Sequence, residues 1–405
     1  MTVHTRQEDV SKILTESMQT AIETDGTDDY VLAFDIGTTT VVAYLLDGHT
    51  GKLLAQSSGL NPQGQYGADV ISRIQHALKA GSGVLSGCIR TALEELTKEA
   101  AMQAGIQPGK ITAAAIAGNT AMHHLLLGID PKPLVTPPYM PAVSEAIERN
   151  GARILPNIAG FVGGDTVGCM VATRFDQLEE LSMLLDIGTN GEMVLGDRNR
   201  RIACSTAAGP AFESAKISCG MRGAEGAIDH VYIRNGEILY HTIGDYAPKG
   251  LCGSGLLDLV AVLLDMQVID DSGRMKQKQF KLCGNVVLTQ KDVREVQLAK
   301  AAIRTGIELL VEEMGVQTAD IRHVYLAGAF GNYMDPASAC RIGMLPPVLL
   351  DRIIPIGNAA GEGAKRCALS RAEFDYSKRL AEETEFLELA RLPQFQKRYL
   401  DALGF

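Results

Sequence analysis

The chain has 405 residues, of which 46% are hydrophobic and 21% are charged, and its formal net charge is −10. This length exceeds what a single core usually serves, so two domains are expected in a globular protein of ordinary composition. The negative charge and the lack of any Lys/Arg block argue against a nucleic-acid partner, and no apolar run approaches the roughly 18 residues of a membrane helix.

The first 28 residues are polar and lack the basic start and apolar core of a secretory signal, so we expect a cytoplasmic protein. Their apolar residues recur at helical spacing, which predicts an appended helix followed by a loose linker. From 30 to 56 the pattern changes to three short strands separated by turns. Two helices are predicted next, over 67–80 and 83–104, and a strand follows over 111–117.

The proline-rich segment 131–141 is predicted to be extended or irregular, because proline fixes the backbone and removes hydrogen-bond donors. A glycine turn into a helix follows at 161–174. Residues 181–206 then repeat the three-strand pattern of 30–56. The two copies are too far apart for a solenoid, which repeats every 20–50 residues or so, and therefore indicate a duplicated domain.

The second half continues to alternate strands with helices, which indicates α/β architecture in both halves. The elements predicted there are a hairpin over 227–243, a helix from Ser254, an amphipathic helix over 291–314, a strand over 323–330, a strand and helix over 353–366, and a mostly helical tail from Ser370.

Two turns that share the sequence Asp-Ile-Gly-Thr stand at corresponding places in the two copies, DIGTTT at 35–40 and DIGTNG at 186–191. A bound polyphosphate needs backbone N–H groups, small side chains that permit close approach, and a metal ion that offsets its charge. A tight Gly-Thr turn supplies the first two, and an aspartate at the end of the preceding strand can hold Mg²⁺ through water. The pair therefore predicts a nucleotide clamp, although no Walker loop or Rossmann fingerprint is present.

These two motifs resemble the phosphate motifs of the actin-like ATPase superfamily, which includes acetate and sugar kinases, heat-shock chaperones and actin. Residues 326–335 look like its adenosine motif, and 116–124 and 356–364 look like its two connecting helices. The resemblance implies two RNase H-like lobes around a nucleotide cleft, each an α/β lobe with a mixed β-sheet and flanking helices. The expected division is an N-terminal segment at 1–28, a first lobe at 29–164 completed by 355–405, and a second lobe at 165–354.

Four further segments are similar to the ATP-dependent reductive activators of corrinoid proteins; they lie at 61–74, 204–228, 250–261 and 298–310. The resemblance implies that ATP is coupled to the return of a Co(II) corrinoid protein or corrinoid methyltransferase to Co(I), and that the chain forms a homodimer. Such activators usually carry an iron–sulfur domain. The eight cysteines here include no C-x-x-C pair and no iron–sulfur spacing, so we predict no cluster in this chain and a separate electron donor. The alternatives are a cluster assembled from distant cysteines or between two subunits, and a task for this member other than reduction.

Three aspartates are the candidate catalytic residues. Asp35 and Asp186 would hold Mg²⁺ through water, the alternative being that each caps a turn. Asp165 stands at a glycine turn into a helix, where it would orient or deprotonate the attacking water, the alternative being helix N-capping. The phosphate contacts would come from Gly37, Thr38, Thr39, Thr40, Gly188, Thr189 and Asn190.

The adenosine contacts are predicted from the resemblance. Glu213 and Lys216 follow Gly209 and are expected on one helical face, where they resemble the ribose and adenine contacts of the chaperone branch; a surface ion pair is the alternative. Phe330 would lie against the adenosine or in the core. The remaining adenosine candidates are Gly328, Ala329, Gly331, Asn332 and, more weakly, Asn358.

Other features favour structural roles. His123 and His124 lack a third metal ligand and are more often structural, and the glycines of 250–255 more often permit tight packing than bind an anion. The segments 61–80 and 131–150 are candidate partner-facing surfaces. Two alternative functions stay open on the same fold, a small-molecule kinase with Asp165 as its base and a nucleotide-dependent scaffold without enzymatic activity.

Overall fold

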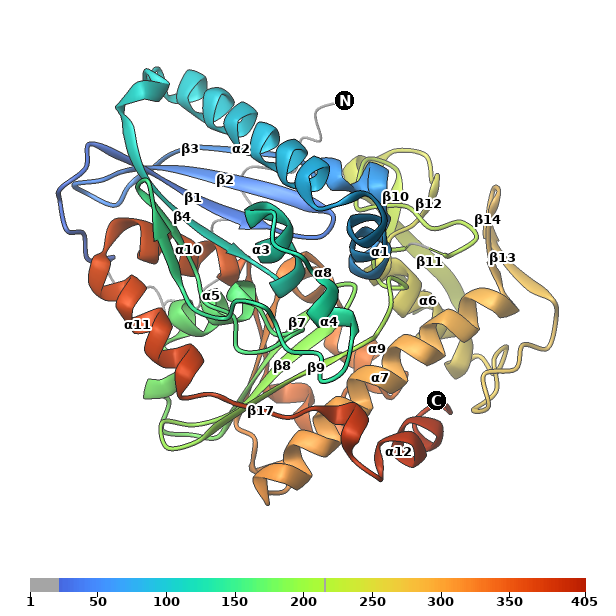
Figure 1. Cartoon of the computed structure of the whole chain (residues 1–405). Coiled ribbons are helices and arrows are strands. Elements are labelled where there is room, and N and C mark those ends of the chain that lie inside the picture. The colour runs from blue at the N-terminus through green and yellow to red at the C-terminus, as the bar shows by residue number, and fades with distance from the viewer. Residues whose placement is uncertain (1–21, 215) are drawn as a thin grey trace. The chain divides into compact units, whose positions relative to one another are not determined.

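The computed structural model describes residues 22–214 and 216–405 (Figure 1). The helix predicted before residue 22 lies outside these residues. The described chain forms two compact units: unit 1 comprises the part up to 179 together with 196–203 and 358–386, and unit 2 comprises 180–195, 204–357 and 387–405. The lobe boundaries expected from the motifs stay a prediction. No helix among the described residues is long and apolar enough to cross a membrane.

Unit 1 is built on a six-stranded mixed sheet of order β3-β2-β1-β4-β6-β5. In this sheet β1 is antiparallel to β2 and parallel to β4, and its central residues are buried on both faces. The strands are β1 (Tyr30–Ile36), β2 (Thr40–Asp47), β3 (Leu53–Leu60), β4 (Ile111–Gly118), β5 (Ile147–Arg149) and β6 (Ala152–Ile154).

Helices cover both faces of this sheet. The helix α2 packs on β2 and β3, whereas α10 packs on β1 and β4 and also contacts α5 (Figure 1). The helices of unit 1 are α1 (Val70–Ala80), α2 (Gly83–Ala104), α3 (Thr120–Leu127), α4 (Lys132–Val135), α5 (Gly164–Thr173), α10 (Ala359–Leu369) and α11 (Arg371–Glu382).

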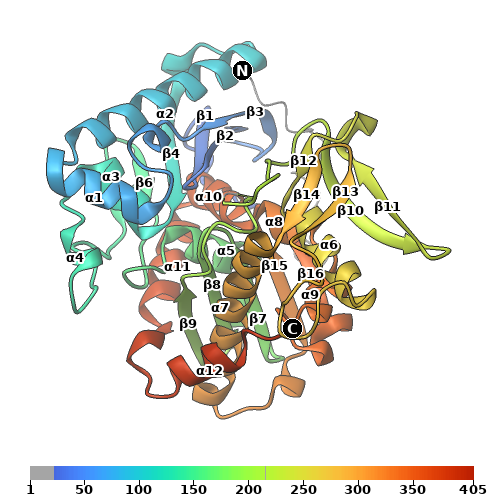
Figure 2. The same ribbon diagram turned by 90° about the vertical axis from the view of Figure 1, so that its right-hand side faces the viewer.

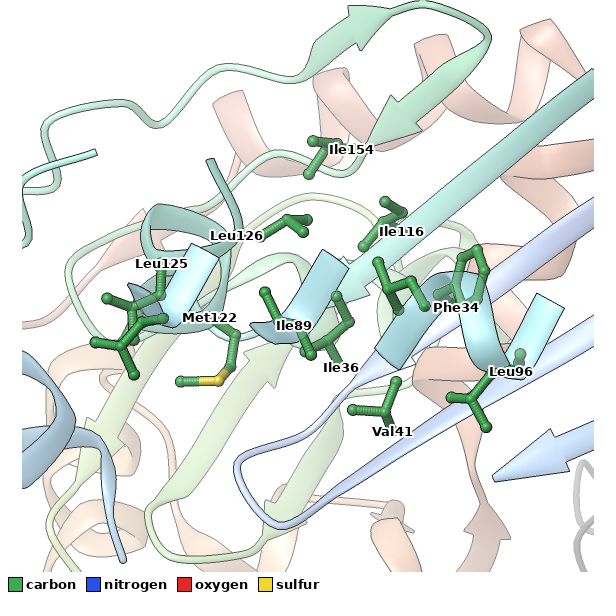
Figure 3. Close-up of a cluster of buried hydrophobic side chains, with 14 of the residues drawn as sticks. Phe34, Ile36, Val41, Ile89, Leu96, Ile116, Met122, Leu125, Leu126 and Ile154 are labelled. Atoms are coloured by element: carbon green, nitrogen blue, oxygen red, sulfur yellow. The ribbon is translucent and has the colours of Figure 1, made fainter. Parts of the chain in front are cut away.

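The core of unit 1 lies between the sheet and the α2 face. Phe34 and Ile36 of β1 pack there with Ile89 of α2 and Met122 of α3 (Figure 3). Each fully buried side chain of this size contributes about 1.5–3 kcal/mol to folding. Because successive strand residues point to opposite faces, Asp35 points away from this core and toward α10.

Unit 2 is built on strands in the order β16-β15-β7-β8-β9. The long helix α7 lies over β8 (Figure 2), and the side chain of its Ile303 faces Gly191. The main elements are β7 (Ser182–Ile187), β8 (Gly191–Gly196), β9 (Arg201–Thr206), α7 (Gln290–Met314), β15 (His323–Ala327), α8 (Gly328–Tyr333) and β16 (Ile353–Gly357). The other elements of this unit are β10 (Ala227–Arg234), β11 (Glu237–Thr242), β12 (Gly250–Leu251), α6 (Gly253–Asp265), β13 (Gln279–Cys283), β14 (Val286–Thr289), α9 (Pro336–Arg341) and α12 (Phe395–Asp401). The division between the units runs through β8 and β9, and β17 (Glu385–Phe386) pairs with the part of β9 that falls in unit 1.

The structure confirms the predicted α/β class and most elements, and it corrects three local predictions. The proline-rich segment contains the short helix α4, because Pro133 stands in its first turn, where a missing N–H costs nothing. Helix α1 begins at Val70 rather than 67, because Asp69 and Ser72 form a capping box there. The strand predicted over 323–330 ends at Ala327, where α8 begins.

His123 and His124 are both buried but are held very differently. His124 contacts the carbonyl of Thr120 through Nδ1 at 2.8 Å and accepts the N–H of Ala142 at Nε2 at 3.0 Å, so the neutral ring is fully used by the backbone. Neither ring nitrogen of His123 has a hydrogen-bond partner among the described residues. Desolvation, with a contribution from His124, lowers the pKa of His123 to about 4.

We expect the His123→Leu variant to be more stable in acid than the wild type. The unfolded chain takes up a proton on this residue near its ordinary pKa of about 6.5, whereas the folded chain resists protonation until about pH 4. His123 therefore removes stability as the pH falls from about 6.5 toward 4, by about 2 kcal/mol at pH 5, whereas the variant keeps the pH dependence of every other group. Urea unfolding at pH 8 and pH 5 measures the difference in stability between the variant and the wild type, which should shift by this amount in favour of the variant. The exposed control His49→Gln should keep the wild-type pH dependence, and an unchanged pH dependence in His123→Leu would contradict the assignment.

Candidate functional site

The first Asp-Gly-Thr turn joins β1 to β2 and is held by side chains from other parts of unit 1. Within the turn, the N–H of Gly37 donates to the carbonyl of Thr40 at 2.9 Å. The Asn61 amide donates to the carbonyl of Gly37 at 2.9 Å, and the Asn119 amide donates to the Thr38 hydroxyl at 3.1 Å. Asn61 and Asn119 were not predicted as site residues, although both lie in the motifs quoted for the resemblance.

Asp35 stands near the end of β1 and is oriented by Asn358. The Asn358 amide nitrogen donates to Oδ2 of Asp35 at 2.8 Å and to the hydroxyl of the buried Tyr44 at 3.1 Å. Its amide oxygen accepts the N–H of Gly361 at 2.8 Å and so caps α10. Asn358 therefore contacts the predicted metal ligand Asp35, whereas its adenosine contact stays a prediction. Tyr44 was missed, since an isolated tyrosine on a strand gives no local signal.

Asp165 lies in the first turn of α5 but is not its N-cap, which is Gly163. Its carboxylate accepts the N–H of Thr166 at 2.7 Å. The start of this helix packs tightly on the start of α3, because a Cβ at Gly163 would lie 2.5 Å from the Cα of Asn119. A side chain larger than hydrogen at Gly163 would therefore push Asp165 away from the end of β4.

Asp35 and Asp165 influence one another electrostatically. Desolvation is the main reason that the pKa of Asp35 rises to about 6; the Asn358 hydrogen bond opposes the rise, and the charge of Asp165 adds to it. Desolvation also raises the pKa of Asp165 to about 6 against the hydrogen bonds from the Thr166 backbone. Two desolvated carboxylates favour a nearby cation or a shared proton.

The second Asp-Gly-Thr turn joins β7 to β8 in unit 2. The N–H of Gly188 donates to the carbonyl of Asn190 at 2.8 Å, and the Thr189 hydroxyl donates to the Glu213 carboxylate at 2.7 Å. Glu213 therefore contacts this predicted phosphate turn. The helical face expected for Glu213 and Lys216 is wrong, because the chain around them forms turns with Lys216 in the left-handed region at a φ of 67°.

The predicted adenosine turn meets the second aspartate within unit 2. Parallel pairing of β15 with β7 places Ala327 beside Asp186. The next residue, Gly328, has a φ of 81°, and a Cβ there would lie 2.6 Å from Oδ1 of Asp186. Only glycine combines this backbone conformation with this close approach. The ring of Phe330 stacks on the ring of Phe212 with centroids 4.8 Å apart.

The remaining predicted site residues are placed by their backbone positions. Ala329, Gly331 and Asn332 lie in α8, and Gly209 has a φ of 76° in a loop with open space around it. The glycines of 250–255 pack closely, since a Cβ at Gly253 would lie 1.9 Å from the carbonyl oxygen of Phe212. All eight cysteines are free thiols, and among the described residues no group of three or more His, Cys, Asp or Glu side chains is placed to hold a metal ion.

We expect the Gly328→Ala variant to lose nucleotide affinity. The added Cβ must displace the Asp186 carboxylate or the backbone, and the left-handed conformation costs about 1–3 kcal/mol in addition. Gly236 offers a matched control, because it has a φ of 82° in the β10–β11 turn and open space around it. Gly236→Ala should be destabilised but should bind nucleotide like the wild type in a fluorescence titration with an ATP analogue. Equal affinities in the two variants would argue against a site at Gly328.

The comparisons with known proteins cover nearly the whole chain. Residues 30–178 match the family described as the RACo middle region, and residues 180–405 match the C-terminal domain of RACo, the ASKHA domain. The chain is 37% identical to the corrinoid activation enzyme RamQ of Eubacterium limosum, over 92% of this chain and 69% of that protein. It is 30% identical to the [Co(II) methylated amine-specific corrinoid protein] reductase of Methanosarcina barkeri, over 62% of this chain and 51% of that protein.

A solved structure agrees with these matches. The reductive activator for corrinoid,iron-sulfur protein superposes with a TM-score of 0.83 at 34% identity, covering 95% of this chain and 67% of that one. The chain thus spans about two thirds of RamQ and of this structure, and about half of the M. barkeri reductase. The ASKHA description confirms the actin-like fold class predicted from the two Asp-Gly-Thr turns. The chain therefore belongs to the RACo family of reductive activators of corrinoid proteins.

Proposed function

We propose that this chain binds and hydrolyses ATP and couples hydrolysis to the reduction of Co(II) to Co(I) in a corrinoid protein or corrinoid methyltransferase, with a separate protein as electron donor. The observation that carries the proposal is the Asp35–Asp165 pair beside the first Asp-Gly-Thr turn, in a chain 37% identical to a corrinoid activation enzyme. We also propose that the protein is a cytoplasmic homodimer.

The residues present fit Mg·ATP. The desolvated carboxylates of Asp35 and Asp165 are suited to a hydrated divalent cation, whose charge would offset the penalty that raises their pKa values. In unit 2, the close approach at Gly328 leaves backbone beside Asp186 without an intervening side chain. Asp35 and Asp186 would each hold the ion through water, and the ion would offset the charge of the phosphates.

The chain's own residues would act on the attacking water and the phosphates. Asp165 would accept a hydrogen bond from a water molecule and take its proton as the water oxygen bonds to the γ-phosphorus. The bond from that phosphorus to the bridging oxygen breaks, and ADP and phosphate result. The Thr38 and Thr189 hydroxyls and the turn N–H groups would hold the phosphates, while α8 would lie along the adenosine.

The decisive experiment follows the oxidation state of cobalt. A Co(II) corrinoid protein is mixed with this protein and a chemical reductant, and Co(I) is recorded by absorbance with ATP, with a non-hydrolysable ATP analogue, and without nucleotide. We expect rapid Co(I) formation only with ATP, together with phosphate release. Equal Co(I) formation in all three mixtures would overturn the coupling to ATP.

The two alternative functions give different results in the same assay. A small-molecule kinase would transfer the γ-phosphate to a metabolite without any corrinoid partner, and a scaffold would show negligible turnover even with one. The comparisons do not favour a kinase, because the named relatives act on corrinoid proteins. Light scattering of the purified protein tests the proposed homodimer, and a monomeric mass would contradict it.

A further inference from the structure

Arg73 is a buried cation that donates one of its hydrogen bonds to the first Asp-Gly-Thr turn. It lies in α1 and is only 1% exposed. Its guanidinium donates from Nη2 to the carbonyl of Thr38 at 2.6 Å and from Nε to the carbonyl of Gly67 at 2.9 Å. A buried guanidinium is costly unless its N–H groups are paired, so these bonds fix both its position and that of the turn.

Asn61 completes the support from the same side of the turn. Its side chain donates to the carbonyl of Gly37 at 2.9 Å, and its backbone N–H donates to the carbonyl of Thr39 at 2.9 Å. Three consecutive carbonyls of the turn, those of Gly37, Thr38 and Thr39, are therefore held by Asn61 and Arg73. Asn61 is itself only 4% exposed, so this arrangement is part of the packed interior.

Each held carbonyl of the turn also fixes the direction of the N–H group of the next residue. In a planar trans peptide the C=O of one residue and the N–H of the next point in opposite directions. Holding the Thr38 carbonyl toward Arg73 therefore points the Thr39 N–H away from Arg73. Holding the Gly37 carbonyl toward Asn61 likewise points the Thr38 N–H away from Asn61. Within the described part of the chain, neither of these N–H groups donates a hydrogen bond.

We propose that Arg73 is a positioning residue for nucleotide phosphate: by holding the Thr38 carbonyl, it directs the N–H of Thr39 toward the phosphate oxygens. The inference rests on the proposed function, because it assigns a task within the same ATP site. Successive N–H groups aimed at one point form an anion-binding concavity, and a carbonyl that rotated into that space would repel the phosphate. The positive charge of Arg73 behind the turn adds to the attraction.

The Arg73→Lys variant tests this role. Lysine keeps the charge but lacks the planar fork, so it cannot hold both carbonyls in the same geometry. We expect its affinity for ATP to fall roughly tenfold, the effect of losing one well-made hydrogen bond to a charged group. Affinity for adenosine should stay within about twofold, because the nucleoside lacks phosphate. Both affinities are measured by calorimetric titration, and KM for ATP should rise more than kcat falls.

Arg201 provides a matched control. It is also a buried arginine of unit 1 at 4% exposure, and it donates to the carbonyls of Asp197 and Arg198 at 3.3 Å, in a turn outside the site. Arg201→Lys should be destabilised in thermal unfolding but should bind ATP like the wild type. If Arg73→Lys unfolds at the temperature of the titration, the same titration at low temperature still gives the ratio of ATP to adenosine affinity.

The outcomes separate the inference from the proposed function. If the wild type binds no ATP, the proposed function fails. If the wild type binds ATP and Arg73→Lys loses it while keeping adenosine, the positioning role stands. If Arg73→Lys binds ATP normally, or loses ATP and adenosine equally, or behaves like Arg201→Lys, Arg73 is only structural and the inference is overturned.

Discussion

Replacing Asp165 by asparagine is expected to lower kcat for ATP hydrolysis by roughly 10²–10⁴-fold, the usual effect of removing a general base. Asparagine can still accept the Thr166 N–H that the carboxylate accepts now, at 2.7 Å, so the fold and the affinity for ATP should survive. It cannot take a proton from water. Phosphate release and ATP affinity, measured side by side, separate the chemical step from binding.

The Glu373→Gln variant is a matched control for Asp165→Asn. Glu373 is a carboxylate in the first turn of α11 in unit 1, and it pairs with Arg174. Glu373→Gln should lose stability, because one partner of a largely buried ion pair is removed, while the folded protein keeps its kcat. Full turnover by Asp165→Asn would show that another group directs the water, and the catalytic assignment would then be wrong.

Replacing Asp35 by asparagine is expected to stabilise the nucleotide-free protein while it abolishes stabilisation by Mg·ATP. The pKa of Asp35 is raised to about 6, which means that the folded state disfavours its charge at neutral pH. A carboxyl group shifted in this direction adds stability as the pH falls through about 6, and it costs stability above that pH. Removing the charge should raise the free energy of unfolding by about 3 kcal/mol at pH 7.5, because a shift of about two pKa units is fully expressed at that pH.

The Asp35→Asn prediction is measured by unfolding in EDTA and again with Mg²⁺ and a non-hydrolysable ATP analogue. A ligand that binds only the folded state stabilises it, so the wild type should gain stability from the ligand. The variant should gain none. Asp69→Asn serves as control, because Asp69 caps α1 and asparagine caps equally well. A less stable Asp35→Asn protein in EDTA would contradict the electrostatic account, and retained stabilisation by the ligand would remove Asp35 from the proposed metal site.

At Asp35 and Asp165, affinity for the ligand and stability of the empty protein oppose one another. A site for a charged ligand must keep carboxylates desolvated and close together before the ligand arrives, which lowers the stability of the empty protein. Asn358 reduces this cost by donating from its amide nitrogen to Asp35, and the oxygen of the same amide caps α10, so the helix position and the carboxylate orientation are fixed together. A change at Asn358 is therefore expected to affect metal binding as well as helix stability.

The sequence alone determined most of the secondary-structure elements and the positions of the two Asp-Gly-Thr turns. Hydrophobic periodicity predicted α2 and α7 closely, since a long amphipathic helix is encoded by neighbours three and four residues apart. The repeated Asp-Gly-Thr turns predicted the duplicated α/β architecture and the ATPase superfamily, and four further segments predicted the family. The helix predicted from local spacing around Glu213 and Lys216 is wrong. The chain forms turns there, and Glu213 accepts a hydrogen bond from the Thr189 hydroxyl.

The tertiary structure decided which side chains meet. Asn358 reaches Asp35 from the far end of the chain, Arg73 reaches the Thr38 carbonyl from a segment expected to face a partner, and Gly328 lies beside Asp186. Each of these contacts depends on strand register and on which face of a strand or helix a residue occupies. A spacing rule within one segment cannot encode such contacts, because they arise only when separate elements pack together.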